Sequence, residues 1–232
     1  MFKKFSLITM IMFFVLITKS NAEETWKITS LDWQPYSGAK MTNQGNSIQK
    51  LREILKKNGI RLLVEFYPWK RAQYLAKKKG YIGYFPAWPE EVTEGFIASS
   101  PADWSELKVI KRSEDKVTFK SFDDLFKNYK VGFVKTYVYP KVINDAIKKY
   151  PHNINKSPNE IALLKKLSYG RYPAAITDPN VMLYLAEQQG ITNIEPLNQI
   201  VIKKELVIAL RFDNENAKRI KLLKKFLKNI AN

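Results

Sequence analysis

The chain has 232 residues, of which 45% are hydrophobic and 13% aromatic, and its net charge is +17. This apolar content is enough for one large core or two modest ones, which argues against an intrinsically disordered chain. With no cysteine and one histidine, His152, the sequence excludes disulfides and thiol chemistry. It also argues against a zinc cluster, and we expect no cofactor.

The excess of basic residues raises the question of a nucleic acid or an anionic membrane surface as a partner. The lysines are spread along the chain rather than gathered into one stripe. Examples are Lys56-Lys57, Lys77 to Lys79, Lys148-Lys149, Lys165-Lys166 and Lys224-Lys225. This spacing is typical of solvated helix faces, so we expect no nucleic-acid partner, and at most a secondary attraction to anionic envelope polymers.

The first 22 residues have the three parts of a secretory signal. Lys3 and Lys4 precede an uncharged apolar run at 5–18, and Ser20-Asn21-Ala22 provides small residues before a polar continuation. The apolar run is short for a permanent membrane helix. We therefore expect cleavage after Ala22 and a periplasmic protein. Three lysines leave with the signal, so the remainder carries +14.

Strand and helix patterns alternate along the rest of the chain. In chain order the sequence predicts a strand at 26–31, a helix at 48–58, strand 61–66, helix 69–79, strand 81–85, strand 107–112, helix 122–126, strand 130–134, helix 140–150, helix 159–169, strand 174–177, helix 179–189, strand 205–211 and helix 214–230. Glycines end several of these helices, as at Gly59 and Gly190. The alternation predicts an α/β fold of mainly parallel sheets flanked by helices.

Several strings, taken in order, resemble one known family. They are Asp32-Trp33-Gln34-Pro35-Tyr36; Pro68-Trp69-Lys70-Arg71-Ala72; Gly83-Tyr84-Phe85-Pro86-Ala87-Trp88 with Ser99-Ser100-Pro101; Lys130-Val131-Gly132-Phe133 with Lys135-Thr136-Tyr137-Val138-Tyr139; Leu167-Ser168-Tyr169-Gly170-Arg171 through Ile176-Thr177-Asp178; and Leu206-Val207-Ile208-Ala209-Leu210-Arg211. Together they resemble the periplasmic solute-binding proteins of the amino-acid-binding type, extracellular solute-binding protein family 3.

The resemblance implies two α/β lobes joined by two crossovers, the type II periplasmic-binding-protein fold. Lobe 1 is then 23–108 plus 204–232, and lobe 2 is 109–203. A small solute binds between the lobes, and hinge closure is read by a membrane transporter, such as an ABC transporter, or by a sensor. We expect a monomeric binding protein with no catalytic activity.

Aromatic residues at strand ends and in loops are the first candidates for ligand contact. These are Trp33, Tyr36, Phe85 and Trp88, whose flat faces suit an apolar group, a sugar or a cationic amine. Ordinary packing is the alternative for each of them.

Asp178 and the segment Lys135, Thr136 and Tyr137 are the candidates from lobe 2. The family places an aspartate like Asp178 on the ligand's amino group, although Asp before Pro179 is also a favoured helix cap. Residues 135–137 precede a helix whose backbone donors suit an anion, or they form a plain connection.

The sequence departs from the family where the ligand's carboxylate binds. Amino-acid binders carry an arginine a few residues before the Ser-x-Pro string, and here Val92 stands in its place. The usual aspartates are replaced by Ile82 and Pro173. Arg71 or Arg112 can substitute for the missing clamp, or each is a surface charge. The ligand's identity therefore stays open.

Two other functions remain open. An enzyme on the same fold, like relatives that dehydrate cyclic acids, needs an acid in the cleft, for which Glu90, Glu91 and Asp178 are candidates. A signalling or envelope-interaction module is the other, suggested by the basic surface and the missing arginine.

Overall fold

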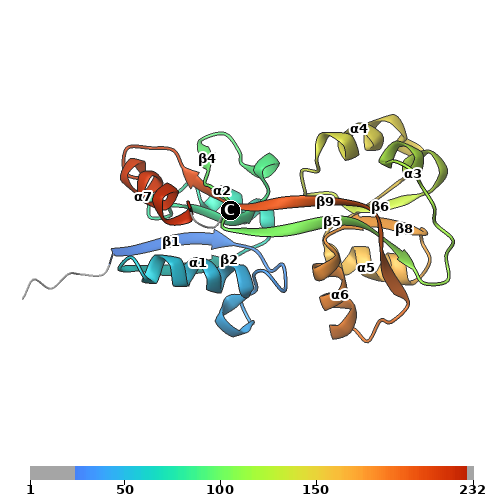
Figure 1. Cartoon of the computed structure of the whole chain (residues 1–232), viewed down its shortest axis with the longest axis horizontal. Coiled ribbons are helices and arrows are strands. Elements are labelled where there is room, and N and C mark those ends of the chain that lie inside the picture. Colours follow the sequence, from blue (N-terminus) through green and yellow to red (C-terminus); the bar gives the residue numbers. More distant parts are fainter. Residues whose placement is uncertain (1–23, 229–232) are drawn as a thin grey trace, which may run out of the picture.

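The computed structural model describes residues 24–228 (Figure 1). The predicted signal peptide at 1–22 lies outside this range. The strands are β1 Glu24–Ser30, β2 Ile60–Phe66, β3 Gly83–Ala87, β4 Phe96–Ala98, β5 Asp103–Arg112, β6 Val131–Val134, β7 Ile154–Ser157, β8 Ala174–Thr177 and β9 Ile194–Arg211. The helices are α1 Asn46–Lys56, α2 Trp69–Leu75, α3 Phe122–Asn128, α4 Lys141–Lys149, α5 Glu160–Ser168, α6 Pro179–Gln188 and α7 Ala217–Leu227, with 3-10 turns at Thr42–Gln44, Pro89–Glu91 and Pro151–Asn153.

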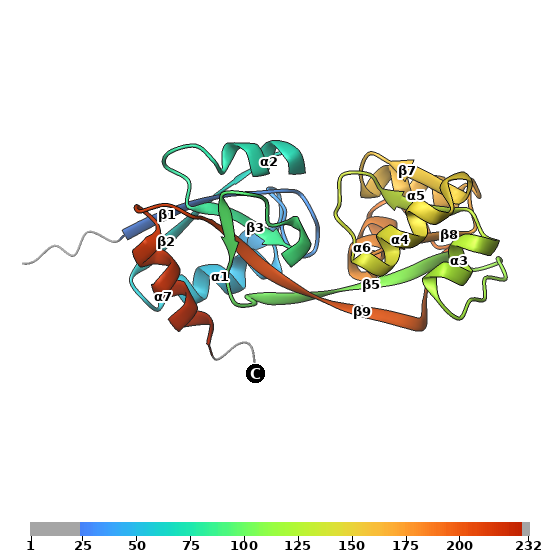
Figure 2. The same ribbon diagram turned by 90° about the horizontal axis from the view of Figure 1, so that it is seen from above.

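The strands form two groups joined by β5 and β9. In the first group β2, β1 and β3 are parallel, and β3 pairs antiparallel with the end of β9. In the second group β7, β6 and β8 are parallel, and β8 pairs antiparallel with β5. Figure 2 shows β5 and β9 running side by side from one group to the other. The predicted fold class, parallel sheets flanked by helices with two crossovers, is confirmed.

Helices cover each group through apolar faces at helical spacing. In α1 the buried residues Ile48, Leu51 and Leu55 recur every three or four positions. In the second half, α5 begins after Asn159, whose side chain accepts a hydrogen bond from the Ala162 backbone N–H at 2.9 Å. The loops that lead into α1 and α5 follow β1 and β7, and both loops contribute residues to the site described below.

The sequence predictions differ most from the structure at five elements. The strands β4 and β7 were not predicted, and β9 begins at Ile194 rather than at 205. The first half of β9 mixes exposed, mostly polar residues with half-buried, mostly apolar ones, so it lacks the continuous apolar run that identifies a buried strand. The predicted helix 69–79 ends at Leu75, and the chain then turns through residues 77–80. The predicted helix 214–230 begins at Ala217.

Gly83 provides a test of the close packing of β3 on β9. A Cβ at this position would lie 2.0 Å from the carbonyl oxygen of Ala209, a backbone atom that cannot rotate away. Gly83→Ala should therefore lower the free energy of unfolding by roughly 3 kcal/mol. Gly59→Ala is the control: a Cβ there meets no atom within 4 Å, although φ is 72°. The control should cost about 1 kcal/mol. Equal losses in urea unfolding would contradict this account of the packing.

Candidate functional site

A cavity of about 600 Å³ lies between the two halves. Its walls on one side are the segments that follow β1 and β2, at 31–34 and 66–70. On the other side they are the segments after β6 and β7 together with α6. Ligand sites of α/β sheets form at the carboxyl ends of parallel strands, which is where all four segments lie. The cavity is therefore at the position that the fold makes suitable for a ligand.

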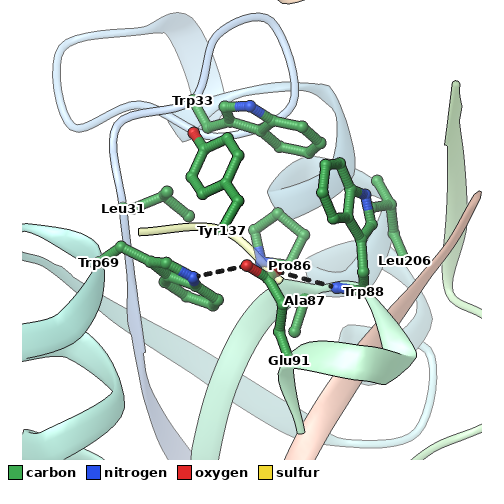
Figure 3. A pocket seen from close by; sticks show the side chains of 9 residues that line it. All are labelled: Leu31, Trp33, Trp69, Pro86, Ala87, Trp88, Glu91, Tyr137 and Leu206. Carbon is green, nitrogen blue, oxygen red and sulfur yellow. Dashed lines mark hydrogen bonds between the residues drawn. The ribbon is translucent and has the colours of Figure 1, made fainter. Parts of the chain in front are cut away.

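A second, much smaller space adjoins the cavity. Its volume is about 10 Å³, room for about one water molecule. Four residues line both spaces: Leu31, Trp33, Trp69 and Tyr137. Figure 3 shows the Glu91 carboxylate here between Trp69 and Trp88, with the rings of Tyr137 and Trp33 above it. The small space is thus the inner end of the cavity.

The aromatic rings at this inner end contact one another from both halves. Trp33 stacks on Tyr36 with centroids 4.6 Å apart and meets Trp88 edge-on at 6.0 Å. Trp88 in turn meets Tyr137, from the second half, edge-on at 5.7 Å. A tight turn holds Trp33 and Tyr36, because the Trp33 N–H donates to the carbonyl of Ser37 at 2.8 Å. The result is a wall of aromatic faces around a carboxylate.

Glu91 is the first of two buried glutamates at the site. Its Oε1 accepts a hydrogen bond from the Trp69 indole at 2.9 Å, and its Oε2 accepts one from the Trp88 backbone N–H at 3.3 Å. The Glu91 carbonyl accepts further bonds from Tyr84 and Gln73. Burial raises the pKa of the Glu91 carboxyl to about 7, and the neighbouring hydrogen-bond donors and the positive charge of Lys70 only partly offset this effect.

Glu160 is the second, and it lies in the wall of the larger cavity at the start of α5. Its Oε1 accepts a hydrogen bond from Thr177 at 2.7 Å, whereas its Oε2 is buried without a hydrogen-bond partner. The indole nitrogen of Trp33 is also buried without a partner. Burial raises the pKa of Glu160 to about 7 and the nearby charge of Asp178 acts in the same direction, while the side chains of Thr177, Trp33 and Tyr137 only partly offset these effects.

Asp178 joins the two halves. One carboxylate oxygen accepts from the backbone N–H groups of Asn180 and Val181, which makes it the cap of α6. The other accepts from the Tyr36 hydroxyl at 3.0 Å and from the Glu106 backbone N–H at 3.0 Å. The Asn180 amide donates to the same Tyr36 hydroxyl at 2.9 Å. Burial raises the pKa of Asp178 to about 6.

The structure brings some of the predicted site residues together and leaves others apart. Trp33, Thr136 and Tyr137 line the larger cavity, and Trp88 lines the inner space. Tyr36 and Asp178 are joined to each other by a hydrogen bond.

Phe85, Arg71 and Lys135 line neither space. Phe85 is fully buried in β3, Arg71 is exposed over the ring of Tyr67, and Lys135 is exposed. Arg112 pairs with Asp115 and Glu114. Ligand contact by any of the predicted residues stays a prediction.

Glu160 and Trp69 were not predicted as site residues. Pro158-Asn159-Glu160 reads from the sequence as an ordinary helix start, and β7 before it was not predicted. A strand at this position, followed by a capped helix, would have indicated that Glu160 lies at a sheet's carboxyl edge. Glu90, a candidate acid, is instead bound to Lys204, which donates to both of its carboxylate oxygens.

Within residues 24–228 no group of three or more acidic or histidine side chains is placed to hold a metal ion. No helix in the same range has the length and apolar character needed to cross a bilayer.

Comparisons with known proteins support the fold. No protein-family model matches the chain, and no curated protein matches it. The structure is similar to a histidine kinase sensor domain with similarity to periplasmic binding proteins, at 16% identity and TM-score 0.73, over 90% of this chain and 91% of that one. It is also similar to an ancestral arginine-binding protein bound to arginine, at 19% identity and TM-score 0.71, over 89% and 92%. A third similar structure is an ancestral amino acid-binding protein described as a precursor of cyclohexadienyl dehydratase, at 18% identity and TM-score 0.66, over 89% of each chain. At these identities the likeness establishes the two-lobed fold of periplasmic binding proteins.

Glu160 should make stability fall as the pH rises. Its pKa is about 7 in the folded protein against an ordinary value of 4.5, so between these values the folded state keeps a proton that the unfolded chain has lost. The stabilisation that this proton gives the folded state is complete below pH 4.5 and is lost as the pH rises to about 7. Over this range the free energy of unfolding falls by up to about 1.4 kcal/mol per pH unit. Glu160→Gln cannot lose a proton, so its free energy of unfolding should decline less steeply with pH.

Urea unfolding of the wild type and Glu160→Gln across this range measures the difference. Glu187→Gln, a change at an exposed position on α6, is the control and should follow the wild type. Parallel profiles for Glu160→Gln and the wild type would show that Glu160 does not titrate in this range.

Proposed function

We propose that this protein is a periplasmic solute-binding protein that captures a small polar solute in the cavity between its halves. The observation that carries the proposal is the cavity of about 600 Å³ whose walls come from both halves. A solute held there contacts both walls, so it favours the arrangement in which they are close. The division into 23–108 plus 204–232 and 109–203, with bending of β5 and β9 between them, belongs to this proposal.

A membrane partner that reads the closed arrangement follows from the same proposal. The fold is shared with a sensor domain and with amino-acid-binding proteins, which supports either a transporter or a sensor in that role. Export through the signal at 1–22 would place the protein where such a partner meets it. The role is binding, and the chain's basic surface is secondary to it.

A thermal-shift screen with a library of small polar solutes tests the proposal. A solute at one hundred times its Kd stabilises the folded state by about 2.7 kcal/mol, which corresponds to a rise in Tm of roughly 5–10 °C for a chain of this size. At least one solute should produce such a shift. A library without a single stabilising solute would contradict the binding function.

Tyr36→Phe tests the closure of the halves. The variant loses the hydroxyl through which Tyr36, in the first half, is hydrogen-bonded to Asp178 and Asn180 in the second. We expect a loss of stability of about 1–2 kcal/mol, and a larger radius of gyration in small-angle X-ray scattering. Tyr172→Phe is the matched control, since its hydroxyl bonds to Leu163 within one half. An unchanged radius of gyration in Tyr36→Phe would argue against hinge opening.

An enzyme on the same fold is the second candidate. The observation in its favour is the pair of buried glutamates, Glu91 and Glu160, whose pKa values of about 7 suit a general acid near neutral pH. Turnover of a prephenate-like cyclic acid that disappears in Glu91→Gln or Glu160→Gln, with binding retained, would support it. No turnover on such acids favours the binding protein.

A further inference from the structure

Three buried carboxylates at the boundary between the halves lack a basic partner. Glu91, Glu160 and Asp178 are at most 6% exposed. Within residues 24–228 none of them lies within 4.0 Å of a lysine or arginine nitrogen, although thirteen other such contacts occur. A buried charge without a partner costs several kcal/mol. In a chain with 39 basic and 22 acidic residues, this accumulation of unpaired acid is local to the site.

The basic side chains near the site are already bound or lie at its rim. Lys204 is buried beside Trp88, but Glu90 holds its amino group through both carboxylate oxygens. Lys70, at the rim of the cavity, is exposed. The described lining of the cavity contains no arginine. The cavity therefore offers an anionic ligand group little beyond Lys70.

The Glu160 carboxylate is the point at which a ligand can bind. Its residue lines the cavity, its Oε2 is buried without a hydrogen-bond partner of ordinary geometry, and the Trp33 and Tyr137 side chains are close enough to lower its pKa. The faces of Trp33, Trp69 and Tyr137 line the same space. A cation gains both from a carboxylate and from aromatic faces. An N–H group would also supply the hydrogen that Oε2 lacks.

Building on the proposed solute-binding function, we propose that the solute is an organic cation that carries an N–H group and no carboxylate. Its ammonium or amidinium head pairs with Glu160 Oε2, and its body lies against Trp33, Trp69 and Tyr137. A carboxylate on the solute would face Glu160, Asp32 and the buried Glu91 with only Lys70 to oppose them. An α-amino acid should therefore bind more weakly than the amine that lacks its carboxylate.

Isothermal titration calorimetry with matched pairs of compounds tests this inference. The pairs are 2-phenylethylamine with phenylalanine, 1,5-diaminopentane with lysine, and agmatine with arginine. 3-Phenylpropionate and 2-phenylethanol supply the anionic and neutral forms of the first body. We expect at least one amine to bind, and to bind at least tenfold more tightly than its amino acid.

Two variants test the role of Glu160 with the amine that binds. Glu160→Gln keeps the size and the acceptor for Thr177 but removes the charge, and should weaken binding at least tenfold. Glu187→Gln, at an exposed position on α6, should bind like the wild type. A Tm for Glu160→Gln close to that of the wild type establishes that it is folded. The relative affinities of the wild-type protein for each amine and its amino acid test the ligand class without any variant.

The pH dependence of amine binding shows whether Glu160 binds the amine as an ionised carboxylate or stays protonated at all pH values. The amines stay charged across this range, so wild-type binding should strengthen from about pH 5 to about pH 8 as Glu160 ionises. Asp178, Tyr137, Tyr139 and Tyr172 face Glu160, and Asp178 titrates below it, at about pH 6. Amine binding is therefore measured at each pH for both the wild type and Glu160→Gln. The part of the pH dependence that is lost in the variant is due to Glu160.

The outcomes distinguish the ligand class from the binding function. Tighter binding of amino acids, of the anion or of the neutral alcohol than of every amine would overturn the cation inference and leave solute binding intact. Equal affinities of the wild type and Glu160→Gln for the amine would overturn the role of Glu160. No binding by any amine, together with no stabilising solute in the library screen, would overturn both.

Discussion

The antiparallel pairing of β5 with β9 is the constraint on which the arrangement of both halves depends. The two strands pair from Asp103 with Leu206 to Arg112 with Ile194, and the register shifts between Leu107 and Val109. The parallel strands of one half attach to β9 through β3, and those of the other attach to β5 through β8. Because this pair connects the halves, a bend along it changes the distance between the walls of the cavity. The hydrogen bond between Tyr36 and Asp178 joins the two halves and opposes such opening.

The same geometry explains why acidic side chains lie close together at the site. The carboxyl ends of the parallel strands in both halves face the cavity, and the loops that follow them place Glu160 and the aromatic side chains in its walls. Burial raises the pKa values of Glu91 and Glu160, and no described basic side chain forms an ion pair with either one, whereas the buried Lys204 is paired with Glu90. These acidic side chains can bind a positively charged ligand group, although the chain as a whole carries a net positive charge.

The fold was predictable from local patterns, and the site only in part. Apolar periodicity and helix-ending glycines located most elements, because each depends on residues close in sequence. The first half of β9 was missed because it has no continuous buried apolar run, and its pairing with β5 makes it a strand. Their places after strands predicted Trp33, Trp88 and Tyr137 as candidates, and the structure puts them in the walls of the two spaces, while the burial of Phe85 reflects a strand covered on both faces. The bond between Tyr36 and Asp178 joins residues 142 positions apart and has no local signal.

The most direct test of the account is a carbon-13 NMR titration of the glutamate side-chain carboxyls in the free protein, with Glu91→Gln and Glu160→Gln used to assign the signals. The account predicts two glutamates, Glu91 and Glu160, that titrate at about pH 7, as burial without a basic partner requires. Addition of a bound amine should lower the pKa of Glu160. If both glutamates titrate near the ordinary value of 4.5, the site is either open to water or already neutralised by a basic group, and the account of the cavity is wrong.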